Sequence, residues 1–183
     1  MDRNRGFTLI ELLVSLFIIA LLTGALLLGY KGTPKEFDLE NVAQKLVSDI
    51  RKTQGYALAL KEFNGGAPEP PRRWGFYIHY QGPGSDNTKY YIFADKDGDF
   101  QKDSSEVAEE ITLQSAVVIG DAWTDQDPSL TELTITFTPP RPKICINCNS
   151  AGNSNDTEAY IRLTKDSLEK IIIITKSGEI KIQ

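Results

Sequence analysis

The sequence predicts an α+β protein: a long N-terminal helix, membrane-spanning in its first half and amphipathic in its second, packed on an antiparallel β-sheet head. Three changes in apolar spacing predict this fold class. Residues 7–30 are apolar almost throughout, residues 39–60 carry apolar side chains every three or four positions, and from residue 74 onward apolar and polar residues alternate in short runs. These spacings are typical of a lipid-facing helix, an amphipathic helix and half-buried strands, in that order.

The first apolar segment, Phe7–Tyr30, has 24 residues, of which 18 are apolar and one, Glu11, is charged. A helix of that length measures about 36 Å, enough to cross a hydrocarbon core of about 30 Å. The segment is longer than the apolar region of a secretory signal peptide and lacks a convincing cleavage site of that kind. Arg3 and Arg5 precede it, so the positive-inside tendency predicts a cytoplasmic N-terminus and a head outside the cytoplasm.

A second helix is predicted over residues 33–62. It begins with Thr33-Pro34-Lys35-Glu36, a capping box with proline at the first helical position. Charged residues separate the apolar positions, and the resulting apolar stripe needs a sheet to cover it. The stripe consists of Leu39, Val42, Ala43, Leu46, Val47, Ile50, Ala57 and Leu60.

Residues 63–183 are predicted to form the β-rich head. Asn64-Gly65-Gly66 and the prolines after it end the helix, and short runs with a period of two follow. The predicted strands are Trp74–Tyr80, Lys89–Ala94, Val117–Ile119, Leu133–Thr138, Ala159–Thr164, Ile171–Thr175 and Glu179–Ile182.

The junction between the polar N-terminus and the apolar helix has a distinctive sequence, Arg5-Gly6-Phe7-Thr8-Leu9-Ile10-Glu11-Leu12-Leu13-Val14. It resembles the leader junction of type IV pilins and type II secretion pseudopilins. The resemblance implies that residues 1–6 are a leader, that prepilin peptidase cleaves after Gly6, and that Phe7 is then N-methylated. Residues 7–31 would anchor the subunit in the bacterial cytoplasmic membrane and later form the filament core.

A carboxylate inside an apolar helix costs about 2.5–3.5 kcal/mol on insertion scales, so Glu11 needs a partner. Cleavage after Gly6 creates an ammonium at Phe7, and the resemblance implies that Glu11 pairs with this group on a neighbouring subunit during assembly. The expected partners are prepilin peptidase, other pilin or pseudopilin subunits and a membrane assembly platform. The alternative is a plain single-span anchor in which Glu11 is incidental.

The second helix carries a further resemblance. Residues 40–59, ENVAQKLVSDIRKTQGYALA, are similar to the helix of GspH/FimT-type minor pilins. This implies a structural subunit, a minor pilin or pseudopilin, in a pilus or a secretion pseudopilus. A function of another class stays open, namely a membrane-anchored module outside the cytoplasm that binds calcium or another ligand, or acts as an adhesin.

The acidity of the head is concentrated in one loop. The chain has a net charge of −5, and Asp95–Glu110 alone holds seven acidic residues and two lysines. Within it, Asp95, Asp97, Asp99, Asp103 and Glu106 occupy positions 1, 3, 5, 9 and 12 of a calcium-binding loop. Position 6, where such loops have glycine, is Phe100. The alternatives are a calcium site and a surface loop of Asx turns that needs no metal.

The two cysteines, Cys145 and Cys148, are expected to form a local disulfide if the head lies outside the cytoplasm. Free thiols are the second interpretation. A zinc site would need about four ligands, and the chain has only one histidine besides the cysteines. The sequence therefore predicts no required cofactor, and calcium is the one candidate ion.

No arrangement of residues in the sequence indicates an enzyme. Serine, histidine and carboxylate residues are present without the spacing of a nucleophile and its base. A sequence pI of about 5.0 disfavours binding to nucleic acid phosphates. We therefore expect a structural protein that neither catalyses a reaction nor binds nucleic acid.

Overall fold

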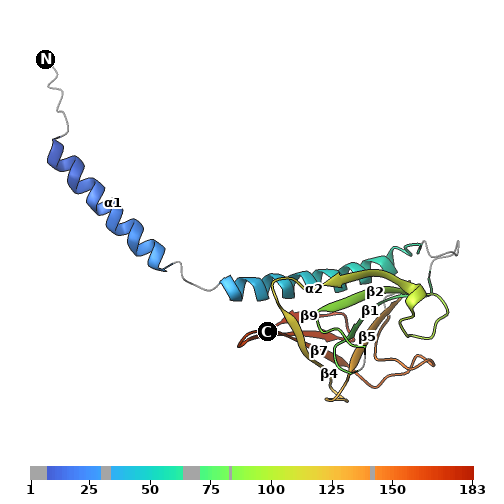
Figure 1. Cartoon of the computed structure of the whole chain (residues 1–183). Coiled ribbons are helices and arrows are strands. Elements are labelled where there is room, and N and C mark those ends of the chain that lie inside the picture. The colour runs from blue at the N-terminus through green and yellow to red at the C-terminus, as the bar shows by residue number, and fades with distance from the viewer. Residues whose placement is uncertain (1–7, 30–33, 64–70, 83, 141–142) are drawn as a thin grey trace. The chain divides into compact units, whose positions relative to one another are not determined.

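The structure, a computed structural model, describes residues 8–29, 34–63, 71–82, 84–140 and 143–183. The chain divides into two compact units, residues 1–34 and residues 35–183. The first contains helix α1, and the second contains almost all of helix α2 and the strands, as Figure 1 shows by colour along the chain.

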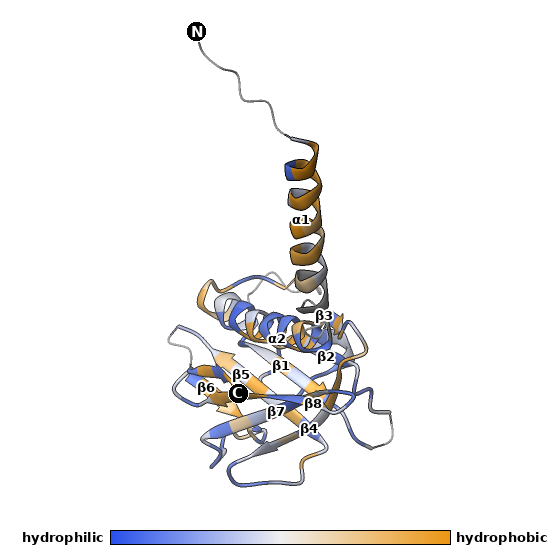
Figure 2. Cartoon of the chain, turned by 90° about the vertical axis from the view of Figure 1, so that its left-hand side faces the viewer, coloured by the Kyte–Doolittle hydropathy of each residue, from blue (hydrophilic) through white to orange (hydrophobic). Residues whose placement is uncertain are grey.

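Helix α1 (Leu9–Gly29) is apolar on all sides. Its large apolar side chains from Leu9 to Leu22 are each 47–83% exposed, and Figure 2 shows apolar colour over most of the helix. The predicted helix over residues 7–31 begins and ends outside the described residues. Within the described parts of the chain, no helix combines the length and the apolarity that a membrane crossing requires.

Helix α2 (Pro34–Leu58) starts at the proline of the predicted capping box, whose Thr33 lies outside the described residues. The predicted end at residue 62 is wrong. Leu60 adopts a φ of +47°, and its N–H donates to the Ala57 carbonyl while the Lys61 N–H donates to the Tyr56 carbonyl. This pair of bonds is a Schellman motif, usually built on glycine, so the sequence lacked the usual stop signal.

In the part of the chain that the structure describes, the head forms two antiparallel sheets, which the sequence did not distinguish. The first has the strand order β3-β2-β1-β5-β6 and the second has the order β4-β7-β8-β9. The strands of the first sheet are β1 (Arg73–His79), β2 (Lys89–Asp95), β3 (Val107–Thr112), β5 (Glu132–Thr138) and β6 (Lys143–Ile146). Those of the second are β4 (Val118–Thr124), β7 (Glu158–Lys165), β8 (Leu168–Thr175) and β9 (Ile180–Ile182).

Strands β3 and β6 were not predicted, and β4 is longer than the predicted Val117–Ile119. Strand β3, with the sequence VAEEIT, lies at an edge of its sheet and carries two adjacent glutamates, so it lacks the strict alternation that marks a strand. Strand β6 has only four residues and contains Cys145. Both lie at the edges of the first sheet.

One core lies between α2 and the two sheets. Seven of the eight predicted residues of the apolar stripe, from Leu39 to Ala57, are buried against side chains from both sheets. Leu60 is 51% exposed, because it lies beyond the end of α2, so its predicted place in the stripe was wrong. Figure 1 shows α2 running along the strands, and Figure 2 shows its polar and apolar sides. Leu46 and Ile50 of α2, Phe76 and Ile92 of the first sheet and Ile161 of the second are fully buried in this core.

Glu109 joins α2 to the edge strand β3. Its carboxylate accepts hydrogen bonds from Lys52 Nζ at 2.6 Å and from the Tyr56 hydroxyl at 3.0 Å. Burial alone would raise the pKa of Glu109, but the Lys52 ammonium and the Tyr56 hydroxyl outweigh it and lower the pKa below its ordinary value of 4.5. The charged form is therefore favoured in the folded head.

This lowered pKa predicts a loss of stability in acid. The stabilisation is present above about pH 4.5, the pKa of an unfolded glutamate, and is lost as the pH falls through the lower folded pKa. We expect Glu109→Gln to lower the free energy of unfolding by about 0.2–1 kcal/mol near neutral pH, as for a partly exposed ion pair. As the pH falls, the free energy of unfolding of this variant should decrease less than that of the wild type. Urea unfolding of the variant and of the wild type over a series of pH values measures both effects.

Glu110→Gln is the matched control, because Glu110 is exposed on the same strand and pairs with Lys89 at 2.7 Å. Equal acid sensitivity of the Glu109→Gln and Glu110→Gln variants would contradict the special role of Glu109.

Candidate functional site

The residues at the predicted cleavage site, Gly6 and Phe7, lie outside the described residues, and the described chain begins at Thr8. Glu11 lies in the first turn of α1. Its Oε2 accepts hydrogen bonds from the Thr8 N–H at 2.9 Å and from the Thr8 hydroxyl at 2.8 Å, and the Glu11 N–H donates to the Thr8 Oγ1 at 3.3 Å. This reciprocal arrangement is a capping box at the start of α1.

The other described hydroxyl groups of α1 are satisfied inside the helix. Ser15 Oγ donates to the Glu11 carbonyl and Thr23 Oγ1 donates to the Ile19 carbonyl, each at 2.7 Å. Polar side chains bonded in this way need no water, so they suit an apolar environment. Among the described polar side chains of this helix, the Glu11 carboxylate is the only ionisable group.

The acidic loop begins at Asp95, the last residue of β2, which is fully buried. Its Oδ1 accepts the Gly98 N–H at 2.6 Å and its Oδ2 accepts the Phe100 N–H at 3.1 Å. Oδ2 also forms an ion pair with Arg73 Nη1 of β1 at 2.7 Å. The carboxylate of Asp95 therefore organises the loop around itself.

Asp97 and Asp99 continue the loop as Asx turns. Asp97 Oδ1 accepts the Asp99 N–H at 3.2 Å, and Asp99 Oδ1 accepts the Gln101 N–H at 2.7 Å. One ligand atom from each of Asp95, Asp97 and Asp99 lies within 4.8 Å of the other two. The structure places neither Asp103 nor Glu106 in this group, and Asp103 is exposed before the short turn η1 (Ser104–Glu106).

Glu106 closes the loop from the opposite end and is 3% exposed. Its Oε1 accepts the Lys96 N–H at 2.7 Å, which places the carboxylate against the backbone between Asp95 and Asp97. Its Oε2 is buried and has no hydrogen-bond partner among the described residues. Burial, together with the neighbouring carboxylates of Asp95 and Asp97, raises the pKa of Glu106 above its ordinary value.

Phe100, at the position where calcium loops have glycine, adopts a φ of +67°. The left-handed region is unfavourable for a bulky residue, so something must hold the side chain. The Arg73 guanidinium lies 3.6 Å from the centre of the Phe100 ring. Gly152 also approaches the ring so closely that an added Cβ would lie 2.8 Å from Phe100 Cζ.

Comparison with known proteins gives one match, at the N-terminus. Residues 1–27 match the family model of the prokaryotic N-terminal methylation motif. The match supports the type IV pilin and pseudopilin family. No curated protein and no solved structure matches the chain.

The match confirms the predicted prepilin-type motif, and the likeness to GspH/FimT-type minor pilins stays a prediction. A prepilin-type motif indicates a membrane-anchored pilin precursor. It implies processing by prepilin peptidase and assembly with other pilin subunits, and proteins of this kind are structural.

Cys145 and Cys148 are joined as a disulfide, with their Cα atoms 5.7 Å apart. Both cysteines are buried. Cys145 also lines a pocket of about 290 Å³ with Arg73, Phe100 and Gly152. The disulfide therefore belongs to the same region of the head as the acidic loop.

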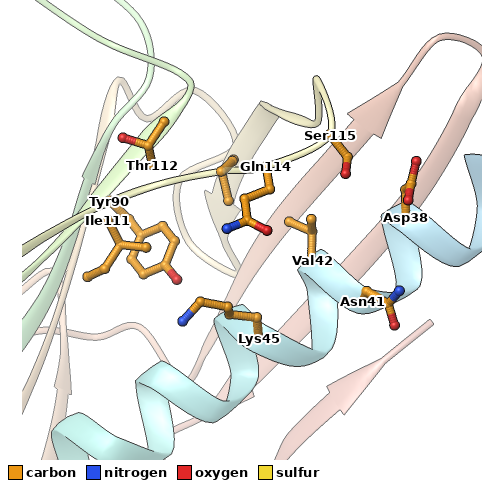
Figure 3. A pocket seen from close by; sticks show the side chains of 10 residues that line it. Asp38, Asn41, Val42, Lys45, Tyr90, Ile111, Thr112, Gln114 and Ser115 are labelled. Atoms are coloured by element: carbon orange, nitrogen blue, oxygen red, sulfur yellow. The ribbon is translucent and has the colours of Figure 1, made fainter.

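A second pocket, of about 330 Å³, lies between α2 and the end of β3 (Figure 3). Asp38 and Lys45 of α2 face Tyr90 of β2 across it. These groups are committed elsewhere, because Asp38 pairs with Lys165, and both Lys45 and the Tyr90 hydroxyl bind Asp49. The pocket brings together no reactive group with a catalytic partner among the residues that line it.

Three features of these sites were missed from the sequence. Thr8-Leu-Ile-Glu11 has the spacing of a capping box, a signal that was present and overlooked. The ion pair of Arg73 with Asp95 depends on the pairing of β1 with β2, in which these two residues are direct partners. The contact of Phe100 with Gly152 spans 52 positions and has no local signal.

Proposed function

We propose that this chain is a minor pilin or pseudopilin, a structural subunit of a type IV pilus or a type II secretion pseudopilus. The match of residues 1–27 to the methylation motif carries this proposal. The exposed apolar surface of α1 supports it, because a soluble protein rarely leaves a continuous apolar surface of this size without a partner.

In this proposal, residues 7–31 first anchor the subunit in the cytoplasmic membrane, with residues 1–6 in the cytoplasm and the head outside. The bonding of Ser15 and Thr23 within α1 supports an apolar surrounding. On assembly the helix leaves the lipid and packs against the helices of other subunits. Its apolar contacts with lipid tails are replaced by apolar contacts with those helices.

Glu11 supplies the polar signal for assembly. After cleavage, the amine of Phe7 on an incoming subunit pairs with Glu11 of a subunit already in the filament. In an apolar filament core, each charge without the other is expensive, and a pair in the correct register makes both tolerable. The capping box supports this role, because Thr8 holds the Glu11 carboxylate at the start of α1, where such an amine would arrive.

The other partners follow from the same proposal. Prepilin peptidase removes residues 1–6, and an assembly platform in the membrane inserts the subunit. The likeness of residues 40–59 to GspH/FimT-type proteins favours a minor subunit over a major one. The net charge of −5 argues against binding of nucleic acid by the head.

The experiment that tests processing is an intact mass with N-terminal sequencing of the full chain extracted from its native membrane. We expect a chain that starts at Phe7. Its mass should exceed that of unmodified residues 7–183 by the mass that one N-methylation adds. The control is the same chain from cells without prepilin peptidase, where residues 1–6 should remain. A chain that keeps Met1–Gly6 in cells with active peptidase would overturn the proposal in favour of an ordinary membrane anchor.

A further inference from the structure

We propose that the free edge of strand β9 binds an extended peptide segment of a partner protein, which joins the second sheet as an added strand. The segment that fits this edge has an acidic residue between two apolar residues. Strand β9 lies at one end of the order β4-β7-β8-β9, so it pairs on one side only among the described strands. The proposal concerns the head alone, and holds or fails independently of filament assembly.

The hydrogen-bonding pattern between β8 and β9 identifies the backbone groups that are free. In an antiparallel pair, residues that exchange backbone hydrogen bonds alternate with residues that do not. Ile171 and Gln183 exchange both bonds, at 3.0 Å and 2.8 Å. The next pair joins Ile182 to β8 without such bonds, and the same holds for Ile180 two positions earlier. The N–H and C=O groups of Ile180 and Ile182 therefore point away from β8, and no other group among the described residues bonds them.

A hollow of about 430 Å³ lies beside this edge, between β9 and α2. It is lined by Gln44, Val47, Ser48 and Arg51 of α2 and by Ile180 and Ile182 of β9. The side chains of Ile180 and Ile182 pack against the core, so residues opposite them in an added strand would point the same way, toward Val47. Main-chain bonds supply affinity in this mode of recognition, and pockets for alternate side chains supply specificity. The hollow therefore favours apolar residues at these two positions.

Lys181 and Arg51 determine the charge that the added strand should carry. The Lys181 side chain lies on the opposite face of β9 from the two isoleucines and is 54% exposed. It pairs with Glu179 at 3.0 Å, but both side chains are exposed, so this pair contributes little. Arg51 adds a second positive charge at the hollow, and none of the residues that line the hollow is acidic. An acidic residue opposite Lys181 would be its close cross-strand neighbour, and opposite charges there are stabilising.

A second copy of the chain fits this edge less well than an acidic segment. Two β9 strands that use both isoleucines of each copy place Lys181 directly opposite the same lysine of the other copy, and like charges there are destabilising. A register shifted by two residues toward the turn avoids this contact, but it places Gly178, with a φ of +93°, opposite Ile182. Lysine on an edge strand is a common guard against such pairing. The edge is therefore protected against self-pairing and open to a strand of the opposite charge.

The test is surface plasmon resonance with the full-length chain immobilised in detergent and the peptide Ser-Thr-Val-Glu-Val-Thr-Ser in solution. We expect saturable binding with a dissociation constant below about 1 mM. A peptide with lysine in place of glutamate should bind roughly three to ten times more weakly, because its charge matches that of Lys181. A glutamate peptide with both valines N-methylated keeps the charge but lacks the backbone donors, and it should not bind saturably. A surface with detergent alone serves as the reference.

Lys181→Glu should reverse the preference between the two unmethylated peptides, because it reverses the charge opposite the central residue of the peptide. The side chain is exposed, so this variant should keep its fold, which circular dichroism checks. The matched control is Lys143→Glu, since Lys143 is an exposed lysine on the edge strand β6 of the first sheet. This control should keep the wild-type preference for the glutamate peptide.

Four results would overturn the assignment. The first is the absence of saturable binding of the glutamate peptide at millimolar concentration. The second is equal binding of the N-methylated peptide, which would mean that charge alone attracts it. The third is an unchanged preference in Lys181→Glu, which would place the peptide elsewhere. The fourth is pairing of two copies in sedimentation that Ile180→Pro abolishes, since proline removes an outward N–H of the edge, and this would assign the edge to a second copy.

Discussion

Replacing Glu11 by glutamine is expected to abolish incorporation of the subunit into filaments while leaving the head folded. The change removes the charge that we propose pairs with the Phe7 amine of a neighbour, and an unpaired charge in an apolar core costs about 3–5 kcal/mol. That corresponds to a loss of about two to nearly four orders of magnitude in the assembly equilibrium. The measurement is the ratio of filament to membrane-bound subunit in cells, with the wild type alongside.

Glutamine is chosen because it can keep the capping box, in which the Glu11 side chain bonds the Thr8 N–H at 2.9 Å. The complementary variant is Thr8→Val, which removes the hydroxyl that bonds Glu11 and keeps the charge. We expect Thr8→Val to assemble. Wild-type recovery of Glu11→Gln in filaments would refute the charge-pairing role, and loss of assembly in Thr8→Val alone would assign the effect to helix capping.

One-sided burial gives the clearest signal in the sequence. The apolar stripe of α2 and the alternation in β7 follow directly from a core on one face. Strands β2 and β5 were predicted as well, although each has a run of consecutive buried residues. Edge strands β3 and β6 lack that alternation. The end of α2 depends on a Schellman motif at Leu60, and the sequence has no glycine at that position to indicate it. Division into two sheets is a property of long-range pairing and leaves no local pattern.

The candidate sites also differ in how much of each could be predicted from the sequence. The motif around Gly6, Phe7 and Glu11 is contiguous, so the sequence alone predicted it, and the match over residues 1–27 supports it. The acidic loop is contiguous as well, but the sequence could not weigh calcium against Asx turns. Three facts needed the structure: the burial of Glu106, the φ of Phe100 and the position of Arg73.

Replacing Trp74 by alanine is expected to destabilise the head by about 3–5 kcal/mol, which lowers its melting temperature by roughly 10 °C. Trp74 is 1% exposed, and its indole packs edge-on against Tyr56 with ring centres 4.9 Å apart. Its Nε1 donates to the Lys61 carbonyl at 3.2 Å. The substitution therefore opens a cavity and removes the donor that ties the chain just after α2 to β1.

The head contains its own control for this effect, because the only other tryptophan, Trp123, is half-buried and stacks on Tyr160 with ring centres 5.1 Å apart. Trp123→Ala should cost little more than the stacking, about 0.5–1.5 kcal/mol. Thermal unfolding followed by circular dichroism compares the two without relying on tryptophan fluorescence. If Trp74→Ala costs no more than Trp123→Ala, Trp74 does not hold α2 to the sheet. A large difference shows that the contacts of Trp74 with Tyr56 and with the Lys61 carbonyl stabilise the junction between the end of α2 and β1.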